Sequence, residues 1–233
     1  MSLSPAQRHS QRVTMQQQQA RLEEVNTTAS LHLQMQEITA DVEVLRSLAT
    51  TADRVEMKRD VLLPKWLPTV ESYLELGRVY ANPVFAYCVV WLFDVGQFDQ
   101  ALDWADIAIE QGQATPENIK SKFPAFVADQ MMNWAEQASQ AGEELEPYFS
   151  RTFENVTQRW RLHEEITAKW FKFAGLLMLR DEHGQARAAA IDSVETLSAA
   201  DRLLAAAEAK YHKAGVSTMR RTIAARIRAL TPD

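Results

Sequence analysis

The chain has 233 residues, of which 46% are hydrophobic, and a formal net charge of −6 at pH 7. This length allows one large or two small domains with sizeable cores, and the acidic total by itself argues against a nucleic-acid partner. The N-terminus is polar and the apolar run at 85–93 is too short to span a bilayer, so we expect a soluble protein without signal peptide or membrane span. The single cysteine, Cys88, lies in that run, which predicts a buried thiol in a reducing, intracellular compartment.

Helical periodicity dominates the sequence, and the β-branched alternation that is typical of strands is nearly absent. Five of the seven glycines lie where helical patterns end, namely Gly96, Gly112, Gly142, Gly184 and Gly215. We therefore predict an all-α protein: a helical bundle with tetratricopeptide-like helical hairpins, a long N-terminal helix and a flexible N-terminal arm.

The N-terminal region divides into two predicted segments. Residues 1–29 are polar and include a glutamine run at 16–19, so we expect a flexible basic arm. Residues 30–61 are predicted to form a long helix with an apolar heptad seam. The seam consists of Leu31, Met35, Ile38, Val42 and Leu45, continued by Ala49 and Ala52. Two interpretations fit this seam: a coiled coil through which copies of the chain oligomerise, or the first core helix of a single chain.

Residues 62–142 are predicted to form a central helical core. Pro64 and Pro68 are expected to end one helix and start the next, because proline lacks an N–H group and restricts the residue before it. The dipeptide Asn82-Pro83 is typical of a helix N-cap followed by the first helical residue.

The stretch around Gly96 predicts a tight helical hairpin, because a residue suited to left-handed backbone stands between two apolar helical patterns. It resembles a tetratricopeptide half-repeat, with a second candidate at 177–191, although two ordinary helix pairs explain both stretches equally well. Apolar neighbours at helical spacing predict buried side chains for Trp66, Trp91, Trp104 and Leu74.

The C-terminal half is predicted to continue as helices. The acidic linker at 142–147 is the candidate boundary of a C-terminal helical subdomain, residues 147–233. We expect helices to start at Thr115-Pro116 and at Pro124, a long helix from about 147 to Arg180, and further helices over 186–199, 201–214 and 218–230.

Basic residues gather at the two ends of the chain. Residues 1–22 and 209–233 together hold nine basic residues and one acidic residue, whereas the rest holds sixteen basic and thirty acidic residues. Such local asymmetry matters more than total charge for steering a polyanion. The candidate DNA-binding residues are Gln7, Arg8, His9, Arg12, Arg220, Arg221, Arg226 and Arg228. For the last four residues, an equally good alternative is that they only complement the dipole of the final helix. No single helix face collects all four side chains, which weakens their case as DNA contacts.

The sequence lacks the motifs of common catalytic and metal sites. It contains no phosphate loop, no nucleophile elbow, no His-Glu-x-x-His and no Cys-x-x-Cys. The triplets 163–165 and 181–183 combine histidine with carboxylates, but adjacent residues of a helix point in different directions. We therefore predict no catalytic residue, no metal site and no cofactor in this chain.

Several stretches are similar to one family of viral proteins. Ser-Pro-Ala-Gln-Arg-His at 4–9 resembles the start of the small terminase subunit of Peduovirus-type tailed bacteriophages. Leu-Leu-Pro-Lys-Trp-Leu-Pro at 62–68, with Leu-Glu-Leu-Gly at 74–77, resembles its central motif, and Ala-Gly-Val at 214–216 matches near its end.

The resemblance implies a DNA-packaging role. A small terminase subunit recognises the packaging site on concatemeric phage DNA and hands that DNA to a large subunit, which carries the ATPase and usually the nuclease, for cohesive-end cutting. The implied partners are phage double-stranded DNA, the large subunit and further copies of the chain in a ring, with no membrane, in the host cytoplasm.

We interpret the chain as a non-enzymatic DNA-recognition subunit. Members of the family are often called the endonuclease subunit, so a metal-dependent endonuclease within this chain is one alternative. A helical-repeat scaffold that binds only protein is the other.

Overall fold

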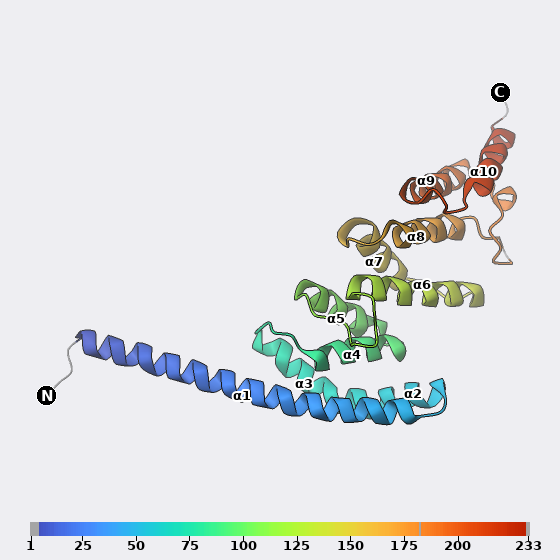
Figure 1. Ribbon diagram of the computed structural model, residues 1–233. Coiled ribbons are helices and arrows are strands. Elements are labelled where there is room, and N and C mark those ends of the chain that lie inside the picture. Colours follow the sequence, from blue (N-terminus) through green and yellow to red (C-terminus); the bar gives the residue numbers. More distant parts are fainter. Residues whose placement is uncertain (1–4, 182, 232–233) are drawn as a thin grey trace. The chain divides into compact units, whose positions relative to one another are not determined.

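The computed structural model describes residues 5–181 and 183–231, and within 5–29 it describes the side chains of positions 9, 13–15, 17 and 18 alone (Figure 1). In this part of the chain every regular element is helical and no β-strand occurs, which confirms the predicted all-α class. The α-helices are α1 (Pro5–Ser47), α2 (Thr51–Met57), α3 (Leu63–Leu76), α4 (Pro83–Asp94), α5 (Phe98–Glu110), α6 (Phe123–Ala141), α7 (Tyr148–Glu154), α8 (Glu164–Leu177), α9 (Val194–Lys210) and α10 (Ser217–Leu230). Short π-helical segments η1 (Lys58–Leu62) and η2 (Asn155–Arg159) and the 3₁₀ turn η3 (Ala188–Ala190) connect some of them.

The chain divides into two compact units. The first comprises Met1–Gln97 with Glu110–Pro116, and the second comprises Phe98–Ile109 with Glu117–Asp233. The linker at 142–147, expected to separate two subdomains, lies inside the second unit. This short polar stretch forms a turn between α6 and α7, and its role as a subdomain boundary stays a prediction.

Helix α1 runs through both of the predicted N-terminal segments. It begins at Pro5, so the arm expected at 1–29 is helical from that residue on. It ends at Ser47, so the continuous helix expected over 30–61 is interrupted. The hydroxyl of Thr50 then caps the start of α2. A cap residue of this kind has extended backbone, which is why the helix cannot pass through it.

The middle of the heptad seam is buried within the first unit. Ile38, Val42 and Leu45 have at most 8% of their surface exposed, and Ile38 has none. Leu31 and Met35 are half-buried. The break after α1 removes Ala49 and Ala52, both exposed, from the seam. The intrachain packing favours a core helix at the three buried positions, and an interface between copies of the chain stays a prediction.

Helix α1 is held against α3 by polar contacts as well. Asp41 on α1 accepts hydrogen bonds from the Nζ atom of Lys65 at 2.7 Å and from the indole Nε1 of Trp66 at 2.8 Å. These two hydrogen bonds, one of them from a charged donor, compensate the carboxylate for its partial burial. This contact fixes which face of α3 meets α1.

The prolines of the central motif do not separate two helices. α3 follows η1 directly at Leu63, with Pro64 in its first turn and Pro68 inside it, so the predicted break at Pro68 is wrong. Proline is tolerated in a first turn, where no N–H partner is needed, but Pro68 removes an interior hydrogen bond. Burial of Trp66 and Val70 on the same helix offsets this loss.

The central aromatic side chains are buried, with one exception among the predicted core residues. Trp66, Trp91 and Trp104 are 3%, 2% and 7% exposed, which confirms the prediction. Leu74 is only half-buried, because the buried face of α3 continues to Tyr73 instead. The residue that follows a buried position on a helix points away from that face.

Helix α4 starts and ends as the sequence predicts. The Asn82 side chain accepts from the backbone N–H of Phe85 at 3.1 Å, and Pro83 is the first helical residue. Gly96 has φ 77°, a left-handed conformation that favours glycine, and α5 begins two residues later. Within α4 the thiol of Cys88 is buried, and burial raises its pKa well above the ordinary value.

Several helix boundaries predicted after Gly112 are wrong. No helix starts at Thr115-Pro116, and the long helix expected up to Arg180 is divided, because 160–163 are extended between η2 and α8. The second hairpin candidate, 177–191, contains turns and η3, so the helix predicted over 186–199 starts only at α9. Ser193 is the N-cap there: its hydroxyl accepts from the backbone of Thr196 at 3.1 Å.

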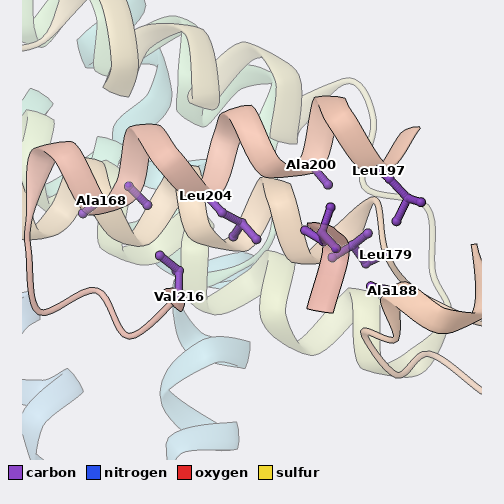
Figure 2. Close-up of a cluster of buried hydrophobic side chains, with 9 residues drawn as sticks. Ala168, Leu179, Ala188, Leu197, Ala200, Leu204 and Val216 are labelled. Carbon is purple, nitrogen blue, oxygen red and sulfur yellow. The ribbon is translucent and has the colours of Figure 1, made fainter. Parts of the chain in front are cut away.

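The C-terminal core of the second unit is a cluster of small and branched side chains from α8, α9 and α10 (Figure 2). Leu197, Ala200, Leu204 and Ala207 lie on one face of α9 and are fully buried. Gly175 on α8 faces this row, and a Cβ atom added there would lie 2.9 Å from Leu204 Cδ2 and 3.1 Å from the carbonyl oxygen of Ala200. The two helices therefore approach each other closely because position 175 has no side chain.

Replacing Gly175 with alanine should destabilise the second unit although alanine is the better helix former. The gain in helix propensity is about 1 kcal/mol, whereas overpacking a filled core costs about 1–3 kcal/mol. We expect a lower midpoint of thermal unfolding by circular dichroism. The double variant Gly175→Ala/Leu204→Ala should lose less stability than the sum of the two single changes, because it removes one of the clashing groups. Additive losses would contradict the close approach of the two helices.

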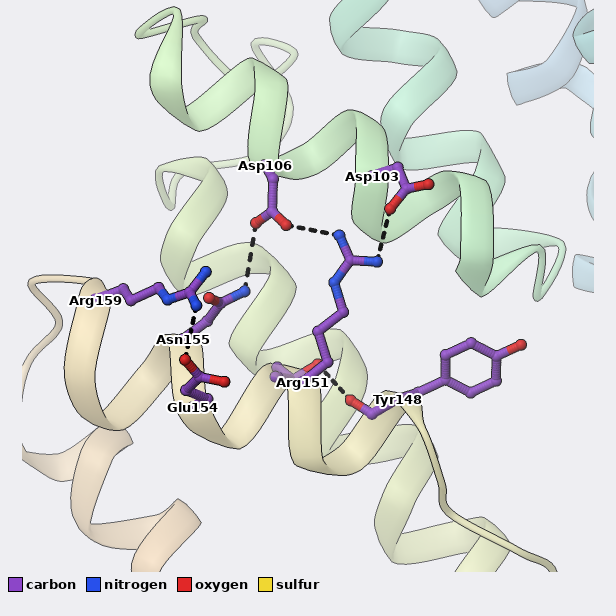
Figure 3. A network of polar contacts seen from close by, with 8 residues as sticks. Asp103, Asp106, Tyr148, Arg151, Glu154, Asn155 and Arg159 are labelled. Carbon is purple, nitrogen blue, oxygen red and sulfur yellow. Dashed lines mark hydrogen bonds and ion pairs between the residues drawn. The ribbon is translucent and has the colours of Figure 1, made fainter.

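A polar network ties α5 to α7 in the second unit (Figure 3). The Arg151 guanidinium donates to Asp103 and to Asp106, each at 2.7 Å, and the Asn155 amide donates to Asp106 at 3.3 Å. Arg151 is about one-third exposed and spans two carboxylates one helical turn apart, so it positions α7 on α5.

Candidate nucleic-acid interface

Helix α10 carries the four C-terminal arginines on two different faces. The buried face includes Ile223, which packs in the cluster of α8 and α9. Arg220 and Arg226 flank this face and are 32% and 27% exposed. Arg221 and Arg228 are exposed and lie two helical turns apart, which places them on one outer face.

Arg220 is engaged by two carboxylates of α9. Its Nε donates to Asp201 at 2.9 Å, and its Nη1 donates to Glu208 at 2.7 Å. These hydrogen bonds, that to Asp201 first, raise the pKa of Arg220 above its ordinary value, and the bonds from Ser217 and Arg220 lower the pKa of Glu208. A guanidinium that already satisfies two carboxylates has little left for a phosphate.

Arg226 is engaged in the same manner at the other end of the helix. It donates from Nε to the carbonyl oxygen of Ile191 at 3.1 Å and pairs through Nη2 with Asp192. Both contacts fasten the segment before α9 to α10. Among the C-terminal candidates, Arg221 and Arg228 therefore stay available for DNA, because their guanidinium groups make no ion pair with any described residue.

The N-terminal candidates lie on the first turns of α1. His9 is exposed. The side chains of Gln7, Arg8 and Arg12 lie outside the described residues, so their role in DNA binding stays a prediction. Their backbone is helical, so position 12 is four residues, about one turn, beyond position 8.

A second group of basic side chains, which no sequence motif indicated, lines a pocket in the second unit. The pocket, about 490 Å³ in volume, is lined by Lys120 and Lys122 before α6 and by Arg161 and His163 before α8. The two segments lie about forty positions apart in a stretch that is acidic overall, so averaging charge along the chain conceals them. The one sequence signal is local: two lysines in three residues, with no acidic residue between them.

Glu182 of the triplet 181–183 lies outside the described residues, and among the described residues no three His, Cys, Asp or Glu side chains are grouped as possible metal ligands. Asp181 instead closes a turn, accepting from the backbone N–H groups of His183 and Gln185 at 3.0 and 2.9 Å. These hydrogen bonds, that of Gln185 first, lower the pKa of Asp181. Among the helices described, none combines the length and apolar character needed to cross a membrane.

The matches to known proteins concern one class, the terminases of phages. The family model for the phage small terminase subunit matches residues 35–165, more than half of the chain. The chain therefore belongs to the phage small terminase subunit family, which confirms the resemblance of the sequence motifs.

Two relatives show how far the similarity extends. The chain is 46% identical over 190 residues to the "Probable terminase, endonuclease subunit" of Haemophilus phage HP1, an alignment that covers 82% of this chain and 68% of that protein. It is 30% identical over 179 residues to the "Terminase, endonuclease subunit" of Escherichia phage P2, covering 76% of this chain and 72% of that protein. No solved structure matches the chain.

Proposed function

We propose that this chain recognises the packaging site on concatemeric phage DNA and delivers that DNA to the large terminase subunit, which cuts the cohesive ends and drives packaging in the host cytoplasm. Membership of the small terminase subunit family carries the proposal. The exposed arginines of α10 support it, because guanidinium groups without carboxylate partners are suited to phosphate contacts.

A homo-oligomeric ring is part of this proposal. Each subunit offers few candidate cations for DNA at its ends: the exposed Arg221 and Arg228, and Arg8 and Arg12 of the N-terminal segment, where His9 lies as well. A ring repeats each of these cations once per subunit, and linked weak interactions bind jointly far more tightly than one of them alone. The remainder of the chain is acidic overall, so a duplex is attracted only where cations are locally concentrated.

Removing the terminal arginines should weaken DNA binding and make it less dependent on salt. The variants Arg8→Ala/Arg12→Ala and Arg221→Ala/Arg228→Ala should each flatten the slope of log affinity against log salt concentration by about one unit for each phosphate that is no longer neutralised. The assay is fluorescence anisotropy with a duplex from the cohesive-end region of the phage genome. The folded state and native mass should not change, because Arg221 and Arg228 are exposed and the segment 1–22 is too polar to be expected in a core.

A matched control is Arg46→Ala/Arg59→Ala, which removes the same charge from two exposed arginines of the first unit. Its slope should equal that of the wild type. If both terminal variants also keep the wild-type slope, the termini do not bind the DNA. If the wild-type chain binds no DNA even at low salt, the proposed function is wrong and a scaffold that binds only protein becomes the better interpretation.

The names of both relatives favour a second candidate, an endonuclease that resides in this chain. A nuclease of this kind uses metal ions to stabilise the attacking and leaving oxygens. Cutting of cohesive-end DNA by the purified chain with Mg²⁺, without the large subunit and abolished by a chelator, would establish it. An uncut substrate under conditions where the two subunits together cut it would assign the cleavage to the large subunit.

A further inference from the structure

The pocket before α6 and α8 concentrates positive charge in the body of the second unit. Lys120, Lys122, Arg161 and His163 line it and are all exposed, and none of its described lining residues is acidic. Their side chains make no ion pair or hydrogen bond with any described residue. A concave surface lined by one sign of charge raises the local concentration of the opposite charge.

These cations contrast with three arginines of the same unit that are ion-paired. Arg151, Arg220 and Arg226 each hold carboxylates and thereby join two segments of the fold. The basic side chains of the pocket make no such contact with any described residue. The three permanent positive charges of the pocket repel one another unless an anion binds there. Their arrangement therefore fits an external anion better than a structural role.

The start of α6 adds to the positive field. Lys122 is the N-cap of this 19-residue helix, its side chain makes no capping bond, and the first turn holds no acidic residue. The first N–H groups of such a helix and its dipole favour an anion. α8 contributes less, because Glu164 and Glu165 in its first turn already compensate its N-terminus.

We propose that this pocket binds a backbone phosphate of the DNA that the subunit handles. The ligand class is a phosphate group: Arg161 offers a planar fork that matches two phosphate oxygens, while Lys120 and Lys122 act as point charges. The four side chains are exposed, so a rigid duplex can contact them without entering a closed cavity. This assignment rests on the proposed function and places a DNA contact in the body, which the charge of the chain ends did not indicate.

A phosphate contact of this kind carries no sequence information. The variant Lys120→Gln/Lys122→Gln/Arg161→Gln should therefore weaken binding to a cohesive-end duplex and to a duplex of random sequence by the same factor. It should also flatten the slope of log affinity against log salt by about one unit for each phosphate released. The matched control Arg159→Gln/Lys169→Gln/Arg187→Gln removes equal charge from three exposed cations that already pair with carboxylates.

The control should keep the wild-type slope, and circular dichroism melting should show both triple variants folded. The double variant Lys120→Gln/Lys122→Gln, confined to one exposed segment, repeats the test if the triple variant fails to fold. Equal slopes for the wild type and the pocket variant, or equal flattening in the pocket variant and the control, would overturn the assignment.

Calorimetry with inorganic phosphate distinguishes a free phosphate from the DNA backbone. Saturable phosphate binding that the pocket variant abolishes, with an unchanged DNA slope, would assign the pocket to a free phosphate compound and overturn the DNA contact. The wild-type titration separates the two proposals. If the wild type binds DNA and the pocket variant does so equally well, this inference alone fails, whereas a wild type that binds no DNA removes the proposed function.

Discussion

Replacing Trp91 with alanine should bring the first unit close to unfolding. Trp91 is 2% exposed on α4, and its ring contacts Tyr87 with centroids 5.5 Å apart. Removing a buried tryptophan side chain costs about 3–5 kcal/mol, because the cavity that remains collapses only in part. Whole domains are stable by about 5–15 kcal/mol, so this change takes a large share of the total. Urea unfolding followed by circular dichroism measures the loss.

A suitable comparison is Leu76→Ala at the end of α3, where the side chain is 69% exposed. This change should lower the free energy of unfolding by no more than about 0.5 kcal/mol, as surface substitutions do. Similar losses for the two variants would mean that Trp91 does not belong to the core.

Placing a glutamate at Ile38 should unfold the first unit instead of merely separating subunits. Ile38 has no exposed surface, so the folded state has to bury a carboxylate or protonate it. Holding a fully buried glutamate neutral at pH 7 costs about 4 kcal/mol, because pH 7 lies about 2.7 units above its ordinary pKa, and the loss of apolar burial adds to this cost. We expect Ile38→Glu to be insoluble or to lack a cooperative melting transition.

The matched control is Val44→Glu on the same helix, where valine is 53% exposed. It should melt like the wild type, because the new carboxylate stays in water. Native mass spectrometry of both variants also tests the oligomerisation role predicted for the seam. A folded Ile38→Glu chain with reduced oligomer mass would show that Ile38 packs between copies of the chain and not within one.

Helix ends were predictable wherever the signal is contained in a few neighbouring residues. The Asn82-Pro83 start and the Gly96 end of α4 follow from backbone preferences that each residue carries by itself. The predicted helix boundaries were wrong where the same kind of local signal was not followed by a helix or was outweighed by packing. Thr115-Pro116 has the composition of a helix start but none follows, and Pro68 sits inside α3 because buried neighbours offset its missing hydrogen bond.

The candidate DNA contacts were predictable only in part. Sequence spacing separated the four α10 arginines into different faces, but it could not show which face meets α9. The carboxylates that engage Arg220 lie twelve and nineteen positions before it, and the one that engages Arg226 lies thirty-four before it. No local pattern connects residues at such separations. Only the folded chain shows that Arg221 and Arg228 are the accessible pair.

By itself the sequence determined the all-α class, the buried tryptophans and the family of the protein, because helical period, capping chemistry and long motifs are properties of continuous stretches. The tertiary structure alone decided that the middle of the seam is buried in its own chain and that Lys122 and Arg161 line one pocket. The physical reason is the same for both. Burial and electrostatic field depend on which residues, distant along the chain, become neighbours when the helices pack, and that information is not carried by any single segment.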